Sequence, residues 1–217
     1  MAADPDLSAE RVDYAGEHLL ESTVPSEPYA LFDAWLEDAF AAKERGVLPE
    51  PTAMVASTSA GDRPSSRTVL LKEVDRNGFV FFTNYGSRKA TELAASPYAA
   101  LLFGWYPLQR QVRVEGVSER LPRSESERYF ATRPLASQLG AWASAQSTEV
   151  TLEELLVAYR RAEERFEGTE VPCPPYWGGF RVRPETIEFW QGQPSRMHDR
   201  LHYRRTDDGW KMVRLAP

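Results

Sequence analysis

The feature that most constrains the fold of this chain is a series of short strand-like segments joined by turns. Asn77-Gly78 precedes the segment that starts at Phe79, and this dipeptide is preferred in tight hairpins because both residues tolerate positive φ. Ala60-Gly61-Asp62 and Asp207-Asp208-Gly209 mark further turns. Because short turns join antiparallel strands, antiparallel pairing is expected. The predicted strands span residues 53–57, 67–73, 79–83, 99–105, 111–119, 179–183, 186–190, 201–205 and 210–215.

Single helices are predicted between groups of these strands. Apolar residues recur at three- and four-residue spacing in the segment 30–45, which is typical of one buried helix face that ends at Gly46. Ser87 can cap the exposed amides of a short helix. The spacings Ser124–Glu127 and Thr151–Glu154 match the capping box, in which a hydroxyl and a carboxylate exchange hydrogen bonds with backbone amides. The predicted helices span residues 30–45, 87–95, 124–132 and 151–167.

Strands at hairpin spacing with singly inserted helices favour a closed antiparallel barrel, mainly β with peripheral helices, over a doubly wound parallel sheet. The chain lacks a GxGxxG turn and a Walker lysine motif, so any nucleotide must be held by side chains and strand edges. Residues 1–25 show no sustained periodicity of apolar residues. We therefore predict a mobile N-terminal arm with a short helix around residues 9–20. Residues 26–217 are expected to form a single domain.

Charge and composition argue against several classes of binding partner. The formal net charge of −6 argues against nucleic-acid binding, because that requires a basic surface. Apolar runs such as residues 98–103 are too short to cross a bilayer, and residues 1–10 lack the basic and apolar regions of a signal peptide. The single cysteine, Cys173, excludes an intrachain disulfide and a multi-cysteine metal site. We therefore expect a cytoplasmic protein without metal, nucleic-acid or membrane partners.

Basic residues nevertheless gather locally, which suits small anions such as phosphorylated metabolites. The strand period of two places Arg67 and Lys72 on opposite faces, so they would serve two different anions. Arg88 and Lys89 start the predicted helix after Ser87, where unpaired amides and the helix dipole favour a phosphate. Ordinary surface charge at strand ends is an equal alternative.

A phenol and a guanidinium are spaced to share one helix face. Tyr129 and Arg133 lie four residues apart and would present both groups to one oxyanion, before Pro134 ends the helix. Ser137 and Gln138 follow directly. The alternative is that Arg133 only complements the dipole at the helix C-terminus.

The segment Arg196-Met-His-Asp-Arg200 contains one of the three histidines. If this segment is extended, Arg196 and His198 face the same side. A purely structural histidine is the alternative, since His198 lacks the neighbours of a metal site. The chain has no nucleophile elbow, no HExxH and no paired-carboxylate motif, so a bound cofactor would carry the difficult chemical step.

Several motifs occur together and in a fixed order. They are Arg67-Thr-Val-Leu-Leu-Lys72, Thr83-Asn84, Gly86-Ser-Arg-Lys89, Arg110-Gln111-Val112, Arg133-Pro134, Ser137-Gln138, Gly140-Ala-Trp142, Gln146-Ser147, Trp177-Gly-Gly-Phe180, Glu188-Phe-Trp-Gln-Gly192, Arg196-Met-His-Asp-Arg200 and Arg214-Leu-Ala-Pro217. From about Pro28 to the C-terminus, the chain thereby resembles the pyridoxamine 5'-phosphate oxidase family.

The resemblance implies an FMN-binding split barrel whose homodimer builds two FMN sites across the subunit interface. It implies that FMN contacts Arg67, Thr68, Val69, Leu70, Leu71, Lys72, Phe82, Thr83, Arg88, Lys89, Gln111, Gln146, Ser147, Trp190 and Arg200. It further implies that the substrate phosphate is held by Lys72, Tyr129, Arg133 and Ser137, and the substrate ring by Arg196, Met197 and His198. Arg196 and His198 would be the catalytic residues.

The reaction implied is oxidation of pyridoxamine or pyridoxine 5'-phosphate by O2 to pyridoxal 5'-phosphate, with hydride transfer from C4' to flavin N5. Peroxide is the second product, and the amine also releases ammonia. Met197 stands where leucine is more common in the family, and Phe82 replaces a common tyrosine. Arg11 and Tyr14 resemble a pair that closes over the substrate in some relatives. The alternatives are a flavin oxidase of phenazine biosynthesis, which should lack the phosphate-binding set, and a noncatalytic carrier of flavin or pyridoxal phosphate.

Overall fold

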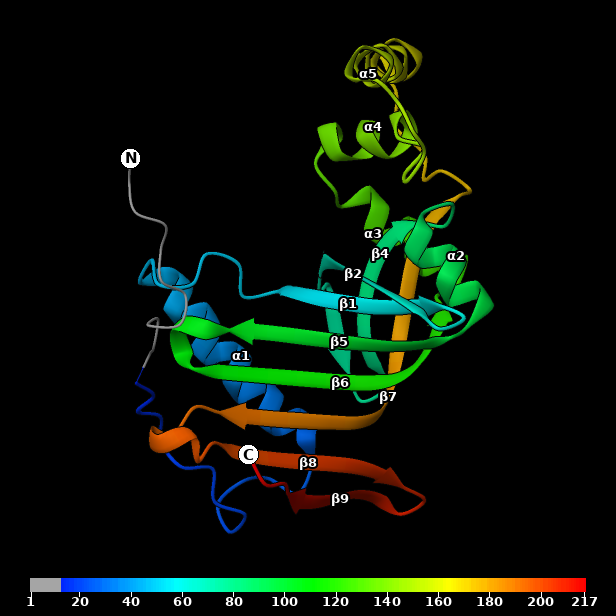
Figure 1. Ribbon diagram of the computed structural model, residues 1–217. Helices are drawn as coiled ribbons and strands as arrows, with labels where there is room; N and C mark the ends of the chain where they lie inside the picture. The colour runs from blue at the N-terminus through cyan, green and yellow to red at the C-terminus, as the bar shows by residue number, and fades with distance from the viewer. Residues whose placement is uncertain (1–12) are drawn as a thin grey trace, which may run out of the picture. The chain divides into compact units, whose positions relative to one another are not determined.

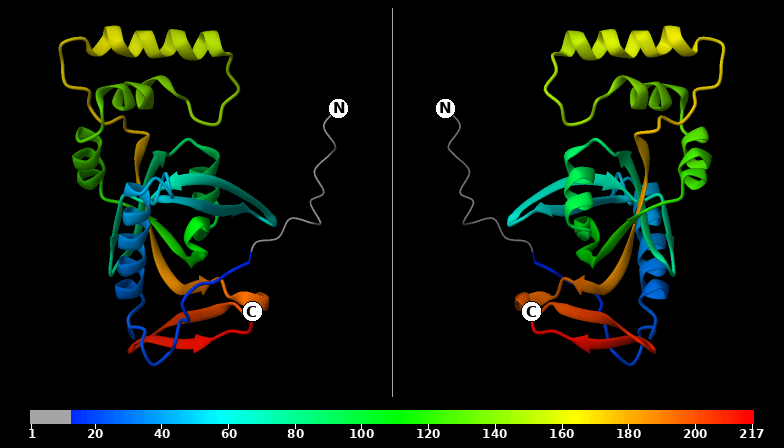
Figure 2. Two further views of the ribbon diagram at one scale, coloured as in Figure 1. Left: turned by 90° about the vertical axis from the view of Figure 1, so that its left-hand side faces the viewer. Right: turned by 90° about the vertical axis from the view of Figure 1, so that its right-hand side faces the viewer.

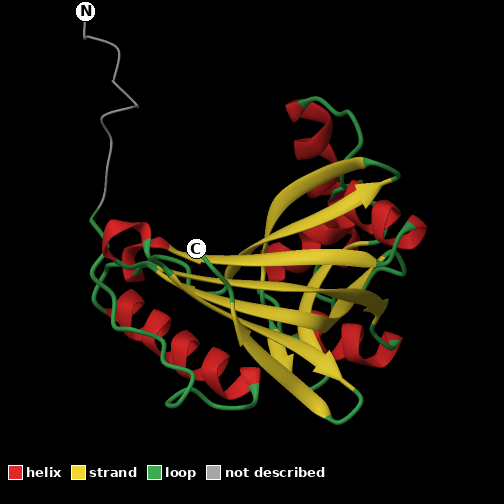
Figure 3. Ribbon diagram, turned by 60° about the horizontal axis from the view of Figure 1, so that its bottom comes forward, coloured by secondary structure: helices red, strands yellow, loops and turns green. Residues whose placement is uncertain are grey.

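The computed structural model describes residues 13–217 and confirms a mostly antiparallel β-sheet with peripheral helices (Figures 1 and 3). The chain divides into two compact units. The first unit holds residues 13–51, Gly104–Val112 and Ile187–Pro217, and the second unit holds Thr52–Phe103 and Arg113–Thr186. Both units are therefore built from segments that are far apart in the sequence.

The strands are β1 (Ala53–Ala60), β2 (Arg63–Leu70), β3 (Glu73–Asp75), β4 (Gly78–Asn84), β5 (Tyr98–Trp105), β6 (Arg110–Arg120), β7 (Trp177–Gln191), β8 (Asp199–Thr206) and β9 (Gly209–Arg214). The sheet order is β2-β1-β5-β6-β7-β4-β3, and β8 pairs with β7 and with β9. The path ends at β2 and at β3, so the expectation of a closed barrel is wrong for the described residues. β3 has only three residues, which gives it few backbone groups with which to close a sheet.

The predicted hairpins are confirmed. β1 pairs with β2, β3 with β4, and β8 with β9, all antiparallel. In the β3–β4 turn the Asp75 carboxylate accepts hydrogen bonds from the amides of Asn77 (2.7 Å) and Gly78 (3.1 Å). Gly78 has φ +139°, and a Cβ there would lie 2.1 Å from the carbonyl oxygen of Val182. The two strands predicted at 179–183 and 186–190 form one continuous strand, β7.

The helices are α1 (Pro28–Glu44), α2 (Arg88–Ala95), α3 (Arg123–Ala131), α4 (Leu135–Ala143) and α5 (Leu152–Phe166), with short 3-10 helices η1 (Tyr106–Leu108) and η2 (Pro194–Arg196). All four predicted helices are present. α4 was not predicted, because Pro134 was interpreted only as a helix breaker. In the structure Pro134 occupies the N-cap of α4, where the lack of an amide hydrogen costs nothing.

The capping predictions have mixed outcomes. Thr151 and Glu154 form the expected capping box, in which the Glu154 amide donates to Thr151 Oγ1 (3.2 Å) and the Thr151 amide donates to Glu154 Oε2 (2.8 Å). The box predicted at Ser124 is wrong: α3 begins one residue earlier, and Glu127 accepts a hydrogen bond from Arg123 Nε (2.8 Å) instead. The prediction for Ser87 is also wrong, since its side chain makes no capping bond.

Aromatic side chains fill the first unit. The predicted apolar face of α1 buries Phe32 and Trp35, whose rings lie 6.0 Å from Trp105 and 5.3 Å from Phe189 respectively. Phe40, which the periodicity assigns to the same face, is exposed. The stripe is thus a packing surface, as the spacing predicts.

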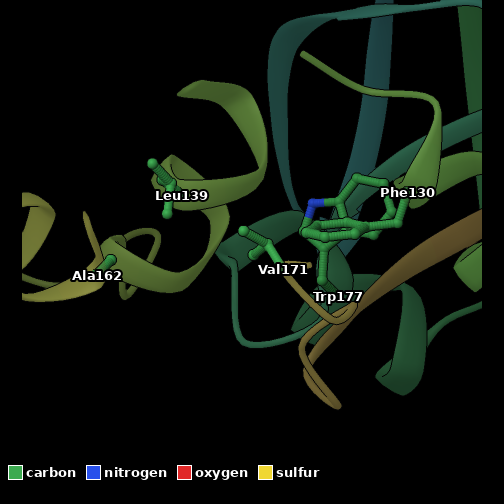
Figure 4. Packing of buried hydrophobic residues seen from close by; sticks show 5 residues of the cluster. All are labelled: Phe130, Leu139, Ala162, Val171 and Trp177. Carbon is green, nitrogen blue, oxygen red and sulfur yellow. The ribbon is translucent and has the colours of Figure 1, made fainter. Parts of the chain in front are cut away.

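A separate hydrophobic cluster lies in the second unit, where α4 and α5 lie side by side (Figure 2). Figure 4 shows its five buried residues, Phe130, Leu139, Ala162, Val171 and Trp177. Cys173 packs against this cluster, and its thiol lies 3.6 Å from the Trp177 carbonyl oxygen. Burial raises the pKa of this thiol, although the Arg123 guanidinium opposes the effect.

Residues 13–25 of the predicted arm contain no helix, and residues 1–12 lie outside the described part. The Gly16 amide donates to the Gly192 carbonyl oxygen (3.2 Å), and the Leu19 amide donates to the Asp199 carboxylate (3.1 Å). The described part of the arm therefore contacts residues at the end of β7 and the start of β8. None of the helices among residues 13–217 combines the length and apolar character needed to cross a membrane.

Candidate functional site

A cavity of about 1140 Å³ in the second unit gathers most of the predicted cofactor and phosphate residues. Its volume lies above the ~300–1,000 Å³ typical of small-molecule pockets. The predicted site residues that line it are Arg67, Thr68, Val69, Leu70, Lys72, Phe82, Thr83, Arg88, Lys89, Tyr129, Arg133, Ser137, Gln146 and Ser147. The predicted site residues that do not line it are Leu71, Gln111, Trp190, Arg196, Met197, His198 and Arg200.

β2 and the residues after it supply one wall of the cavity. The prediction that Arg67 and Lys72 lie on opposite faces is wrong, because β2 ends at Leu70 and the period of two does not reach Lys72. The Lys72 amide donates to the Val80 carbonyl oxygen (2.9 Å), and its side chain is exposed. Arg67 and Lys72 both line the same cavity.

The first turn of α2 supplies a second wall. The hydroxyl of Ser147, not that of Ser87, accepts a hydrogen bond from the Arg88 amide (3.1 Å). Ser147 has φ +75°, which is rare for a residue other than glycine. The Asn84 side chain donates to the Ser144 carbonyl oxygen (3.1 Å) in the same loop. These bonds fix the segment after α4 against the start of α2.

Lys89 is a buried cation in this wall, with 7% of its surface exposed. Its Nζ donates to Thr83 Oγ1 (2.9 Å), Ser87 Oγ (3.4 Å) and Gln146 Oε1 (3.5 Å). All three acceptors are neutral. Burial, and then the charge of Arg67, lower the pKa of Lys89. An anion in the cavity would favour its charged form.

Arg67 and Arg88 are both held by one carboxylate, that of Glu92 on α2. Burial favours the protonated form of Glu92, but hydrogen bonds from Ser65, Thr58 and the two arginines outweigh it and lower its pKa to about 2. No sequence motif pointed to Glu92. Arg88 lies four residues before it on the same helix, but Arg67, Ser65 and Thr58 lie 25 or more positions away, and only the fold brings them to Glu92.

Stacked aromatic rings and one arginine form a third wall. The ring of Tyr129 stacks on Phe82, with centroids 4.0 Å apart, and the Arg133 guanidinium lies 4.6 Å from the ring centroid of Trp177. Burial raises the pKa of Tyr129, opposed by the charge of Arg133, and burial lowers the pKa of Arg133. Among the described residues, no partner accepts a hydrogen bond from the buried Arg133 Nη1.

The expectation that Arg133 shares a helix face with Tyr129 is wrong, because α3 ends at Ala131. Arg133 lies in the turn between α3 and α4, where its carbonyl oxygen accepts a hydrogen bond from Gln138 Nε2 (2.9 Å). Both side chains nevertheless line the cavity. The spacing found the correct pair for an incorrect geometric reason.

Leu71 is buried in the second unit, and the other predicted residues that do not line the cavity lie in the first unit. The segment at Arg196 is not extended as assumed: it forms η2, in which Ser195 and Arg196 have φ +55° and +63°. The His198 Nδ1 accepts a hydrogen bond from the Gln193 amide (3.1 Å), so the neutral ring carries its proton on Nε2. The His198 ring lies 4.6 Å from Trp190.

Tyr14 contributes to the same region, since its ring contacts those of Trp190 (5.6 Å) and His198 (5.2 Å) edge-on. Arg11, the other predicted arm residue, lies outside the described residues. Met197 is 66% exposed.

Arg200 and its neighbour Asp199 anchor the start of β8. Arg200 donates two hydrogen bonds to Glu188, at 3.0 and 3.1 Å, and these bonds raise the pKa of Arg200. Asp199 is buried and accepts hydrogen bonds from Arg214 Nη1 (2.5 Å) and from Gln193 Nε2 (2.9 Å). Asp199 belongs to the Arg196-Met-His-Asp-Arg200 motif, but no role was predicted for it.

Two family models match segments of this chain. Residues 40–165 match the family model described as pyridoxamine 5'-phosphate oxidase. The chain belongs to the pyridoxamine 5'-phosphate oxidase family. Residues 177–217 match the pyridoxine 5'-phosphate oxidase C-terminal dimerisation region, which supports a homodimer.

Individual relatives of this oxidase family cover nearly the whole chain. The pyridoxine/pyridoxamine 5'-phosphate oxidase of Rubrobacter xylanophilus is 53% identical over 98% of this chain and 97% of its own length. That of Salinispora arenicola is 55% identical over 95% and 94%. Among solved structures, PhzG from Burkholderia lata 383, in complex with tetrahydrophenazine-1-carboxylic acid, is 31% identical with a TM-score of 0.83 over 93% of this chain and 99% of its own.

A pyridoxamine 5'-phosphate oxidase-related, FMN binding protein from Nostoc punctiforme has a TM-score of 0.68 over 89% of this chain and 98% of its own, at 14% identity. At this identity the likeness shows a shared fold. The split-barrel class predicted from the sequence is thereby confirmed.

Proposed function

We propose that this chain is a pyridoxal 5'-phosphate synthase, which uses FMN and O2 to oxidise pyridoxamine 5'-phosphate and pyridoxine 5'-phosphate to pyridoxal 5'-phosphate. Peroxide is the second product, and the amine also yields ammonia. The observation that carries this proposal is one cavity lined by five cations, Arg67, Lys72, Arg88, Lys89 and Arg133. We assign them to two groups, with Arg67, Arg88 and Lys89 for the phosphate of the flavin and Lys72 and Arg133 for the phosphate of the substrate.

The cavity fits a flavin nucleotide in its chemistry. Lys89 is buried among neutral acceptors, and two arginines lie on neighbouring elements, so a phosphate would supply the missing negative charge. The proposed FMN residues of the cavity wall are Arg67, Thr68, Val69, Leu70, Lys72, Phe82, Thr83, Arg88, Lys89, Gln146 and Ser147. Leu71, which lies outside the cavity lining, is proposed with them, and Gln111, Trp190 and Arg200 are added across the dimer. FMN held by these residues would supply a hydride acceptor that O2 can reoxidise.

The second group fits the substrate phosphate. The buried Arg133 Nη1 has an unused hydrogen to donate, and the Tyr129 phenol, the Ser137 hydroxyl and the Lys72 ammonium line the same cavity. A guanidinium beside these donors matches a phosphate, which accepts several charge-assisted hydrogen bonds. Such a site would fix one end of the substrate and so orient its reactive carbon.

Arg196 and His198 are proposed to bind and orient the substrate ring, with Met197 beside them. The Gln193 amide, which donates to Nδ1, leaves the Nε2 proton of His198 available as a donor toward the substrate. Two consecutive left-handed residues, Ser195 and Arg196, hold this segment in a strained conformation, which is common where a side chain must be aimed.

A second candidate is a flavin oxidase of phenazine biosynthesis, which the likeness to PhzG favours. Against it stand the relatives above 50% identity, named pyridoxine/pyridoxamine 5'-phosphate oxidase, and the Arg133 group, for which a substrate without a phosphate has no use. A carrier without catalytic activity would need the same phosphate groups. It would not need Arg196 and His198.

The first experiment is an absorbance spectrum of the purified protein, followed by aerobic addition of each phosphorylated substrate while aldehyde and peroxide are assayed. A flavin spectrum with equal amounts of aldehyde and peroxide is expected. Bound flavin without turnover would favour the phenazine or carrier alternatives. Failure to bind added FMN would refute the proposal.

A further inference from the structure

Glu92 contacts two arginines of the cavity although it does not line the cavity itself. Its side chain is 4% exposed, and each carboxylate oxygen serves one arginine. Oε1 accepts a hydrogen bond from Arg88 Nε at 2.8 Å, and Oε2 accepts one from Arg67 Nη2 at 3.2 Å. A single buried carboxylate thus joins a strand arginine and a helix arginine at the cavity wall.

Two hydroxyl groups fix this carboxylate in place. Ser65 Oγ and Thr58 Oγ1 donate to Glu92 Oε2 at 2.6 and 2.5 Å. Arg67 completes the network, because its Nη1 donates to Thr58 Oγ1 at 2.6 Å and its Nη2 donates to Ser65 Oγ. Thr58 is 4% exposed and, like Glu92, does not line the cavity. The network therefore acts on the cavity only through the arginines and Ser65.

Glu92 has two opposite effects on an anion that enters the cavity. Its negative charge weakens the attraction for the anion. Its hydrogen bonds hold two long cationic side chains in place and offset the repulsion among Arg67, Arg88 and Lys89, which lowers the cost of ordering them when the anion binds. Arg88 binds Glu92 through Nε and so keeps its Nη groups for an anion, whereas both Nη groups of Arg67 already donate to Glu92, Thr58, Ser65 and Ala56, which leaves its Nε. The second effect should therefore exceed the first.

We propose that Glu92 is a positioning residue that preorganises Arg67 and Arg88 for the phosphate group of a flavin nucleotide. This proposal rests on the proposed use of FMN. It assigns to Glu92 a role in the preference for phosphorylated over unphosphorylated flavin, which differs from a role in stabilising the fold alone.

The test measures binding of FMN and of riboflavin, by quenching of flavin fluorescence, to the full chain freed of bound flavin. Riboflavin has the same ring and lacks the phosphate. For Glu92→Gln we expect the Kd for FMN to rise at least about tenfold, because hydrogen bonds to charged groups are lost, while the Kd for riboflavin is unchanged. Thr91→Ala, on the preceding exposed helix position, is the matched control and should change neither Kd.

Thr58→Val provides a second variant of nearly the same shape, in case Glu92→Gln does not fold. It removes one hydroxyl from the network and should raise the Kd for FMN about threefold or more, again without effect on riboflavin. Tighter FMN binding in either variant would show that the charge of Glu92 dominates, and an equal loss for both flavins would show a structural role. Either result overturns the proposal. If the unaltered chain binds no FMN, the proposed function itself fails.

Discussion

Arg133 and Lys89 are cations of the same cavity with different hydrogen-bond partners. Lys89 is surrounded by neutral oxygen acceptors, whereas Arg133 stacks on Trp177 and leaves Nη1 without an acceptor among the described residues. A buried donor without a partner costs about 1–3 kcal/mol, which a phosphate oxygen would recover on binding. We therefore expect Arg133 to contribute more to substrate affinity than Lys89.

Replacement of Arg133 by Met should raise the KM for pyridoxine 5'-phosphate about 10- to 100-fold, because charge-assisted hydrogen bonds worth about 1.5–3 kcal/mol are lost. The amount of bound FMN should stay the same. Steady-state kinetics and the flavin absorbance of the purified variant measure both quantities. Arg128→Met, at an exposed position of α3, is the control and should leave KM unchanged. An unaltered KM in the Arg133 variant would exclude its role in substrate binding.

The depressed pKa of Glu92 predicts a specific loss of stability in acid. In the folded chain its pKa is about 2 rather than 4.5, so its contribution is fully present above pH 4.5 and is lost as the pH falls toward 2. Glu92→Gln should therefore unfold at lower urea concentration than the unaltered chain at about pH 6, and the difference should shrink at about pH 3. A difference that stays constant over this range would contradict the prediction.

Among the helices and strands, the features that depend on residues close together in the sequence were predicted correctly. Hairpins at Gly61, Gly78 and Gly209 and the four helices follow from turn residues and periodicity, which are local properties. α4 was missed because Pro134 both ends one segment and caps the next helix. The site was predicted in residue type rather than geometry: Glu92 joins Arg67 from 25 positions away, a distance that no local pattern encodes.

Gly61 in the β1–β2 turn and Gly78 in the β3–β4 hairpin allow two effects of glycine to be separated. Gly61→Ala has open space around the added methyl group, so only its φ of +59° opposes the change, at about 1 kcal/mol. Gly78→Ala also drives the methyl group into the Val182 carbonyl oxygen and should cost about 2–4 kcal/mol. Urea unfolding of both variants measures the free energies. Equal losses would mean that the close contact at Gly78 relaxes freely.

At the scale of the whole molecule, the predicted site residues divide between the two units. The cavity residues belong to the second unit and the Arg196 segment belongs to the first. The match of residues 177–217 to a dimerisation region supports a homodimer, and we propose that each active site draws on both subunits.

Mixing two impaired variants, assayed at a substrate concentration near the KM of the unaltered chain, tests this proposal. One variant carries Arg133→Met and the other carries His198→Ala, and the two are unfolded together and refolded as mixed dimers. If each site combines the second unit of one subunit with the first unit of the other, half of the dimers regain one of two sites, or about a quarter of full activity. Sites built within one subunit would give no recovery beyond the sum of the separate variants.

The rate at which a thiol reagent labels Cys173 can be measured without any engineered residue. The partly buried thiol of Cys173, with a raised pKa, lies 3.6 Å from the carbonyl oxygen of Trp177, a residue that lines the cavity. Because alkylation requires an exposed thiolate, the labelling rate reports how often this part of the second unit opens. Ligands that fill the cavity should slow the labelling, which turns the sole cysteine of the chain into a natural probe of occupancy.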